Sequence, residues 1–298
     1  MMFCFCDRIT SMSVKKYLAK LENLTGKKII VTGGTSGIGL SIVKKVLAKG
    51  GDIVMLARNI TKANEVKSSL MKQYNDRTID IVQYDQSEDD SVIQASNIIA
   101  KDHHDFYALI LNAGVFQNKN KQCLKDDIYL TIKTNYVGLN TFLNNLLPQL
   151  KEEHRFVFQG SLVAGWKNKN IKSLKDKNIS AFQQYIISKS GVEALFYHYS
   201  QLEQNQFSFY LVEPGLTSTD IIRDFPTPIK QMGRIFLKIV SHSNDKAALT
   251  ALLALQSSVD KNSFIVPRGL GTYMGYPKIK RFPHKRERTY LYDLVGKI

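Results

Sequence analysis

Short runs of apolar, often β-branched residues alternate along this chain with longer segments whose apolar residues recur at helical spacing. The short runs predict seven strands, at 28–31, 52–57, 79–83, 107–111, 155–159, 208–212 and 264–266. The longer segments predict helices at 37–49, 61–74, 126–147, 181–203 and 245–257, with a short one near 14–21. One more helix is expected to end at Ala100, with Ser87 and Asp90 as the capping pair at its start.

This order of elements is typical of an α/β fold with three layers. It predicts a doubly wound, mostly parallel, seven-stranded sheet with helices on both faces. In such sheets ligands bind beyond the carboxyl ends of the strands. The residues that directly follow the predicted strands are therefore the first candidates for a functional site.

A glycine-rich loop follows the first strand with the spacing Gly-x-x-x-Gly-x-Gly. Glycine lets a backbone turn tightly and approach a phosphate, and the positive end of the next helix attracts the anion. The loop predicts a pyrophosphate site, and the alternative is a glycine-rich turn without a ligand. The candidate cofactor-binding residues here are Gly33, Thr35, Ser36, Gly37, Ile38 and Gly39.

The residues after the second and third strands bear on the choice of cofactor. A carboxylate after the second strand would bind the adenine ribose and repel a 2′-phosphate, but Arg58 stands there instead. The sequence therefore favours NADP(H) over NAD(H), although Arg58 could also be an ordinary surface arginine. Asp85 follows the third strand, where it could bind the adenine amino group or cap the next helix.

Four polar residues further along are the candidates for the chemistry. Tyr185 and Lys189 lie four residues apart on one predicted helix, so they share a face. An ammonium near a phenol stabilises the phenolate and lowers its pKa, which suits a general acid and base. Ser161 follows the fifth strand and could hold a substrate oxygen, and Asn135 lies in the helix before that strand. A Tyr/Lys pair at this spacing is usually structural by itself, and its position after the other motifs gives it weight.

These motifs resemble, in type and in order, those of the short-chain dehydrogenase/reductase family, which implies a Rossmann fold. The match covers about residues 26–220 and includes 32–39, Asp85, Asn112-Ala113-Gly114, Asn135, Ser161, Tyr185, Lys189, Pro214-Gly215 and Thr217. The resemblance implies that Tyr185 exchanges a proton with the substrate oxygen. It also implies that Lys189 holds the nicotinamide ribose, Ser161 orients the carbonyl and Asn135 keeps a proton-relay water in place.

The resemblance implies cofactor contacts for several further residues. Asn112, with Ala113 and Gly114, would lie under the adenine-side ribose, and Thr217, after Pro214 and Gly215, would contact the nicotinamide carboxamide. We therefore expect a leader over residues 1–25, a dinucleotide-binding catalytic domain over 26–267 and a basic extension over 268–298.

Two segments depart from the shorter members of this family. Ser161 and Tyr185 are 24 residues apart, and the extra segment 166–182 resembles the insertion of the branch with retinol dehydrogenases and protochlorophyllide reductases. Residues 217–232 are expected to cover the substrate, either as an apolar lid or as an ordinary packed loop. Tyr273, Tyr276, Phe282 and Tyr290 in the tail are candidates to pack on that lid.

The net charge of +15 is concentrated in residues 167–177 and 278–288. These segments are interpreted as solvated surface or as a region that steers an anionic cofactor, with nucleic acid or anionic lipid as alternatives. No nucleic-acid partner is expected, since no nucleic-acid motif accompanies the charge. The three cysteines form no disulfide framework or metal motif, and no signal or membrane span is evident. This indicates a reducing, cytoplasmic location and no metal.

The sequence thus predicts an NADP(H)-dependent oxidoreductase that interconverts an alcohol and a carbonyl, with a small-molecule substrate. The family resemblance leaves a homo-oligomer open, since its members often associate through the helices that carry Asn135 and Tyr185. The alternative is a non-catalytic NADP(H)-binding regulator that uses the basic surface to bind a partner. A third hypothesis is peripheral membrane attachment through the tail.

Overall fold

The computed structural model describes residues 13–116, 124–165, 174–175, 178–202, 206–216, 243–269, 272, 274–283 and 293. Its main sheet has eight strands in the order β10-β9-β8-β7-β4-β1-β2-β3. All neighbours pair in parallel except β9 and β10. The strands are β1 (Lys28–Thr32), β2 (Asp52–Ala57), β3 (Ile79–Gln83), β4 (Ala108–Leu111), β7 (Arg155–Gln159), β8 (Ser208–Val212), β9 (Phe264–Pro267) and β10 (Pro277–Lys280).

The predicted doubly wound α/β fold is confirmed, and each of the seven predicted strands lies within one residue of its expected bounds. The eighth strand, β10, is a correction to that count. It comes from the tail and pairs antiparallel with β9, with Lys278 opposite Val266. Its four residues include two lysines and a proline, so the sequence carries no apolar alternation that would have predicted it.

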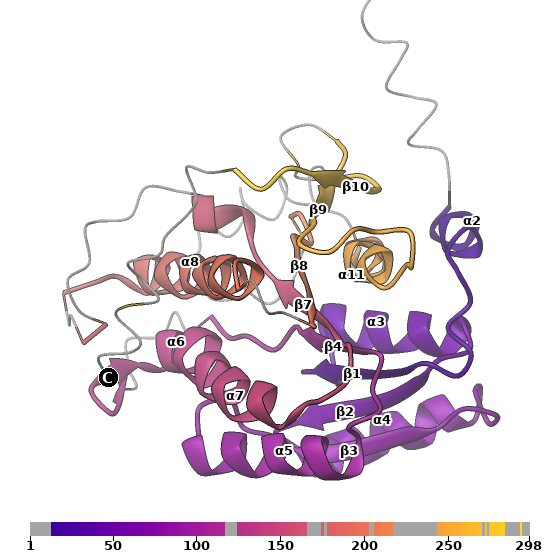
Figure 1. Ribbon diagram of the computed structural model, residues 1–298, viewed down its shortest axis with the longest axis horizontal. Helices are drawn as coiled ribbons and strands as arrows, with labels where there is room; N and C mark the ends of the chain where they lie inside the picture. The colour runs from indigo at the N-terminus through magenta and orange to yellow at the C-terminus, as the bar shows by residue number, and fades with distance from the viewer. Residues whose placement is uncertain are drawn as a thin grey trace, which may run out of the picture.

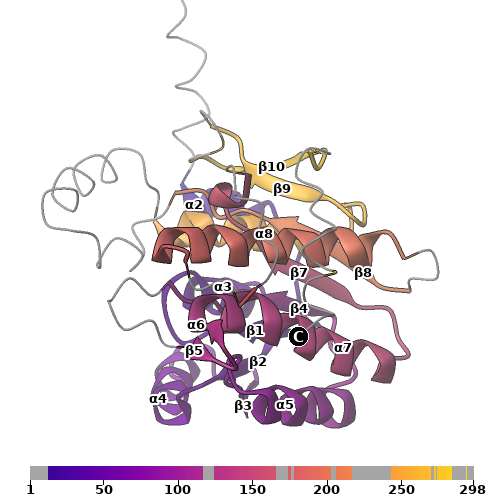
Figure 2. The ribbon, with the colours of Figure 1, turned by 90° about the vertical axis from the view of Figure 1, so that its left-hand side faces the viewer.

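Helices cover both faces of the sheet, as Figures 1 and 2 show. One face carries α3 (Gly37–Ala48), α4 (Ile60–Met71) and α11 (Leu249–Ala254), whose apolar side chains form one buried cluster with Ile29 and Val31. The other face carries α5 (Asp89–Asp102), α7 (Gly138–Leu146) and α8 (Ala181–Ser200), which bury Phe156 and Phe158. A central strand that is covered on both sides reads as a continuous apolar run, which is why β1 and β4 could be recognised.

The helix expected over 126–147 starts later than predicted. Asp126 and Asp127 have φ angles of 52° and 63°, and they turn a hairpin between β5 (Leu124–Lys125) and β6 (Ile128–Tyr129). Aspartate tolerates this left-handed conformation, and two such residues fit the tight turn between antiparallel strands. The helix begins as α6 (Leu130–Ile132), passes through a π-helical turn, Lys133–Val137, and continues as α7. Glu88, and not Ser87, occupies the N-cap position of α5 and makes no side-chain capping hydrogen bond, so the predicted capping pair is wrong.

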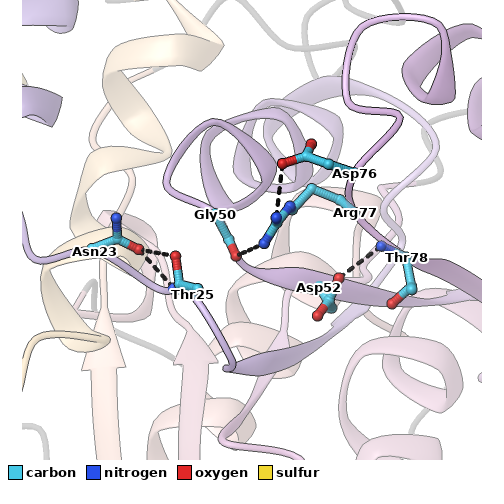
Figure 3. A network of polar contacts seen from close by, with 7 residues as sticks. All are labelled: Asn23, Thr25, Gly50, Asp52, Asp76, Arg77 and Thr78. Carbon is cyan, nitrogen blue, oxygen red and sulfur yellow. Dashed lines mark hydrogen bonds and ion pairs between the residues drawn. The ribbon is translucent and has the colours of Figure 1, made fainter.

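A network of polar contacts lies at the end of the sheet where β1, β2 and β3 begin (Figure 3). Arg77 donates to the carbonyl of Gly50 at 2.7 Å and pairs with Asp76. The backbone N–H of Thr78 donates to the carboxylate of Asp52 at 2.7 Å. These bonds satisfy loop groups at the amino ends of the strands, opposite the edge where ligands of such sheets bind.

Segments from the two ends of the chain meet beside the sheet. Tyr17, in the short helix α2 (Val14–Ala19), stacks on Tyr276 just before β10, with ring centroids 4.9 Å apart. Phe282 packs on Phe196 of α8 and on Phe264. Tyr273, Tyr290 and the expected lid, 217–232, lie outside the described residues, so packing of the tail on the lid stays a prediction. The division at residues 25 and 267 also stays a prediction.

Helix α8 lies unusually close to the π-helical turn. A Cβ atom built on Gly191 would overlap the ring of Tyr136, which is fully buried. Only glycine lets the two backbones approach so closely, and this contact sets the distance between α8 and the turn that carries Asn135.

We expect Gly191→Ala to lower the free energy of unfolding by about 1–2 kcal/mol, because the clash outweighs the gain in helix propensity. Urea denaturation measures this effect. In a Tyr136→Ala background the ring is gone, so the same substitution should become neutral or stabilising. Equal destabilisation in both backgrounds would contradict this account of the packing.

Candidate active site

The predicted site residues that the structure describes lie mainly at or just beyond the carboxyl ends of the strands. The glycine loop joins β1 to α3, Arg58 follows β2, Asp85 follows β3, and Asn112 follows β4. Ser161 follows β7, and Pro214 with Gly215 follows β8. Asn135 belongs to the π-helical turn, whereas Tyr185 and Lys189 belong to α8. Both elements cover the same face of the sheet. Thr217 lies outside the described residues.

The glycine loop has the geometry of an anion cradle. Gly33 and Gly37 have φ angles of 70° and 56°, which favour glycine. A Cβ on Gly39 would overlap the carbonyl of Gly33, so the loop folds tightly on itself. A Cβ on Gly37 would meet no described atom within 4 Å, so this position faces open space. Ser36 begins α3 without a side-chain cap hydrogen bond among the described residues. The first amides of α3 therefore fit a pyrophosphate.

The residues after β4 support this loop. Asn112 donates from Nδ2 to the carbonyl of Thr32 at 3.0 Å, and the N–H of Ala113 donates to the Thr32 hydroxyl at 2.8 Å. A Cβ on Gly33 would lie 3.2 Å from the Cα of Ala113. The structure therefore brings together the glycine loop and the Asn112-Ala113-Gly114 motif.

Arg58 and Asp85 differ in their burial and in the hydrogen bonds of their side chains. The side chain of Arg58 is exposed, and its backbone carbonyl accepts a hydrogen bond from Gln83. Asp85 is half-buried, and its Oδ1 accepts from both the N–H and the hydroxyl of Ser87. Asp85 thus orders the turn before α5 but does not cap that helix. Its second carboxylate oxygen is the one that could bind a ligand.

Asn135 lies in the π-helical turn and is 1% exposed. Its Oδ1 accepts from the N–H of Val115 at 2.7 Å, and its Nδ2 donates to the carbonyl of Val115 at 2.8 Å and to the Ser188 hydroxyl at 3.0 Å. Ser188 in turn donates to the carbonyl of Tyr185 at 2.8 Å. The Asn135 amide therefore joins the loop after β4 to the turn of α8 that carries Tyr185.

Tyr185 is buried beside Ser161 and Phe116. Ser161 forms a hydrogen bond with the Tyr185 phenol, and the Phe116 ring packs edge-on with a centroid distance of 5.3 Å. Burial raises the pKa of Tyr185 to about 12, and the Ser161 hydrogen bond opposes this only in part. The expectation that Lys189 lowers this pKa is thus not met, because the effect of burial is larger. At neutral pH the phenol is protonated and can act as a proton donor.

Lys189 lies one turn further along α8. Its ammonium donates to the carbonyl of Gln159 at 3.0 Å, which ties α8 to the end of β7. A Cβ on Gly114 would lie 3.6 Å from this ammonium and 3.3 Å from Oδ1 of Asn135, so the three groups meet. Burial lowers the pKa of Lys189 to about 8, and the carboxylate of Glu193 opposes the shift.

Three contributors to this site did not emerge from the sequence. Val115 and Gln159 act through backbone groups, which any residue type supplies, so no motif could reveal them. Ser188 stands between Tyr185 and Lys189, and a hydroxyl inside that motif is the one signal that was available. The π-helical turn left no signal, because its apolar spacing resembles that of an ordinary helix.

The family is shown by comparison with known proteins. A family model described as short chain dehydrogenase matches residues 27–228. A short-chain dehydrogenase/reductase of Armillaria gallica is 30% identical over 250 residues, which cover 78% of each chain. This chain therefore belongs to the short-chain dehydrogenase/reductase family. The likeness to its retinol dehydrogenase branch stays a looser resemblance.

A further curated relative and two solved structures are also similar to this chain. A fatty acyl-CoA reductase of Acinetobacter baylyi is 31% identical over 179 residues, 58% of this chain and 56% of that one. Among solved structures, a protein of Mycobacterium paratuberculosis has a TM-score of 0.74 at 20% identity, with 94% of this chain and 96% of that one covered. A Burkholderia cenocepacia short-chain dehydrogenase in complex with NADP has a TM-score of 0.62 at 22% identity, with 80% and 95% covered. These two structures show the fold.

Two negative findings apply to the described part of the chain. It contains no helix that is both long and apolar enough to cross a bilayer. It also contains no group of three or more His, Cys, Asp or Glu side chains placed to hold a metal ion.

The lowered pKa of Lys189 predicts a specific pH dependence of stability. The folded protein releases this proton near pH 8, whereas the unfolded chain holds it to about pH 10.4. The unfolded state therefore binds more protons in this window, and stability rises with pH. Between pH 7.5 and 9.5 we expect Lys189 to add about 2 kcal/mol to the rise in unfolding free energy. Urea denaturation of wild type and Lys189→Met measures the difference, and parallel pH curves would contradict it.

Proposed function

We propose that this protein is an NADP(H)-dependent oxidoreductase that interconverts an alcohol and a carbonyl. The observation that carries the proposal is the hydrogen bond between Ser161 and the Tyr185 phenol beyond the end of β7. Lys189, one turn further along α8, and Asn135 both lie beside Gly114. Membership of the short-chain dehydrogenase/reductase family supports oxidoreductase chemistry, as do the oxidoreductase and reductase names of several relatives. The substrate is a small carbonyl or alcohol compound.

The chain's own residues would hold the cofactor along the carboxyl edge of the sheet. The tight glycine loop and the first amides of α3 would bind the pyrophosphate, with Thr35, Ser36 and Ile38 along it. Asn112, Ala113 and Gly114 would line the middle of the cofactor, and Pro214, Gly215 and Thr217 its nicotinamide end. When bound, the cofactor donates or accepts the hydride.

The proton would pass at the phenol of Tyr185. In the direction of reduction, the protonated phenol donates to the substrate oxygen as negative charge develops there. Ser161 hydrogen-bonds the phenol, so its hydroxyl lies where it can also orient the same oxygen. The ammonium of Lys189 would bind the ribose hydroxyls of the cofactor and, in its charged form, would favour the phenolate that remains. Asn135 keeps α8 and the loop after β4 in register for this transfer.

The choice of NADP(H) over NAD(H) rests on Arg58. It stands after β2 with an exposed side chain, where it can reach a 2′-phosphate and stack on adenine. Two solved relatives in the family are complexes with NADP, which is consistent with this preference. Asp85 would contact the adenine.

The rival hypothesis of a non-catalytic regulator gains no support from the site. Burial of Tyr185 and Lys189 is costly for a pure sensor, and much of the basic surface on which that hypothesis depends lies outside the described residues. The cysteine pattern supports a reducing compartment, and we propose the cytoplasm as its location.

Oxidation of NADPH in the presence of a panel of aldehydes and ketones tests the activity. We expect Tyr185→Phe to lower kcat about 100-fold or more, since it removes the proton donor and leaves the fold in place. Tyr197→Phe is the matched control, because it makes the same change about 18 Å further along α8. Turnover by Tyr185→Phe at the wild-type rate would exclude the proposed mechanism.

Binding of NADPH and NADH by fluorescence titration tests the cofactor choice. We expect Arg58→Ala to weaken NADPH binding about 10-fold and NADH binding much less, because both cofactors carry adenine but only NADPH carries the phosphate. Lys72→Ala, at the far end of α4, makes the same change of charge as a control. If Arg58→Ala leaves the ratio of the two affinities intact, the preference has another origin.

A further inference from the structure

A buried lysine stands at the start of the turn that carries Asn135. The Lys133 side chain is 3% exposed, and its ammonium lies 2.8 and 3.0 Å from the two carboxylate oxygens of Asp89. It also lies 3.1 Å from the carboxylate of Asp126. Asp89 belongs to the first turn of α5, whereas Asp126 is in the turn of the β5–β6 hairpin. One ammonium thus connects three elements of the chain.

The backbone around Lys133 forms the π-helical turn. The N–H of Gly138 donates to the carbonyl of Lys133, an i→i+5 bond that spans Asn135. The carbonyl of Thr134 accepts from Nε2 of Gln86 at 2.7 Å. Gln86, in the loop before α5, and Asp89, at the start of α5, therefore hold the turn through its backbone and through the Lys133 side chain. A π turn is less stable than the α-helix around it, so such external contacts can decide whether it persists.

Stability alone gives no good reason for a charge at this position. Removing an ammonium from water costs several kcal/mol, and an apolar side chain of similar size often packs as well or better. Both carboxylates are about half exposed, at 46% and 55%, so they would stay hydrated without the lysine. The ion pairs instead fix the position of the π-helical turn, because they connect it to α5 and to the β5–β6 hairpin at the same time.

We propose that Lys133 is a positioning residue for the reaction and acts by holding the π-helical turn so that the Asn135 amide meets Val115 and Ser188. This inference rests on the proposed function for its kinetic consequence. Asn135 makes three hydrogen bonds of 2.7–3.0 Å, and each needs the turn in its present register. Without the ammonium, the turn can relax toward an ordinary α-helix, which rotates Asn135 away from the loop after β4. Tyr185 then loses its support through Ser188.

The test compares two buried lysines, each paired with an aspartate. In Lys133→Met we expect kcat to fall about 10- to 100-fold, since misplacement by about 1 Å can have such an effect, while the Kd for NADPH changes less than about threefold. Lys45→Met is the control, because Lys45 is 8% exposed and pairs with Asp245 on the other face of the sheet. We expect Lys45→Met to lower the melting temperature about as much as Lys133→Met does, but to leave kcat unchanged. Equal kcat losses in both variants would overturn the proposal.

A double-mutant cycle tests whether Lys133 acts through Asn135. In an Asn135→Ala background, Lys133→Met should lower kcat no further, because residues that act as one unit are not additive. Lys133→Arg keeps the charge and should retain more activity than Lys133→Met. Additive losses in the cycle, or equal losses in the Met and Arg variants, would overturn the proposal.

Hydrogen exchange separates this inference from the proposed function. Amides of residues 113–116 and 133–138 should exchange faster in Lys133→Met than in wild type or Lys45→Met. This readout needs no turnover. If none of the carbonyl compounds supports NADPH oxidation by the wild type, the proposed function fails. Faster exchange in Lys133→Met would still support the role of Lys133 in that case. If exchange is unchanged in an active enzyme, the inference on Lys133 fails and the proposed function stands.

Discussion

The site depends on the hydrogen bonds that the Asn135 amide makes on two sides. They join the loop after β4 to α8, two elements that the sheet alone would leave free to shift. The Lys189 ammonium makes the second such connection, from α8 to the end of β7. Because both contacts are buried, each bond is worth more than it would be in water, and its loss would leave polar groups unpaired. The side chains of the candidate site are thereby held in one arrangement.

The geometry of the site also requires that backbones approach each other closely, and glycine makes this possible at two places. Gly39 allows the glycine loop to fold against Gly33, and Gly191 allows α8 to lie against Tyr136. In both cases the absence of a Cβ atom sets a distance between a helix and its neighbour. One of these contacts shapes the proposed cofactor cradle, and the other sets the position of Tyr185 and Lys189 relative to Asn135.

Burial shifts the pKa values of the two titratable side chains in the site. It raises the pKa of Tyr185 to about 12 and lowers that of Lys189 to about 8, so both shifts favour the neutral form. A protonated phenol suits the donation of a proton to a carbonyl oxygen. A bound dinucleotide would change this balance, since its phosphates favour the charged form of lysine.

Much of this protein was predictable from sequence, because strands covered on both faces, a glycine loop and a spaced Tyr/Lys pair each leave a local pattern. Those patterns were enough for the doubly wound sheet and for the order of the candidate site residues along its edge. Strand β10 depends on its pairing with β9, and the hairpin at Asp126 and Asp127 is made of strands of two residues each, too short to leave a strand pattern. The π-helical turn was not predictable, since its contacts come from Gln86 and Asp89, which are distant in sequence. The same holds for the shifted pKa values and for the ion pairs of Lys133. Burial and proximity are properties of the assembled chain, and only the tertiary structure decides them.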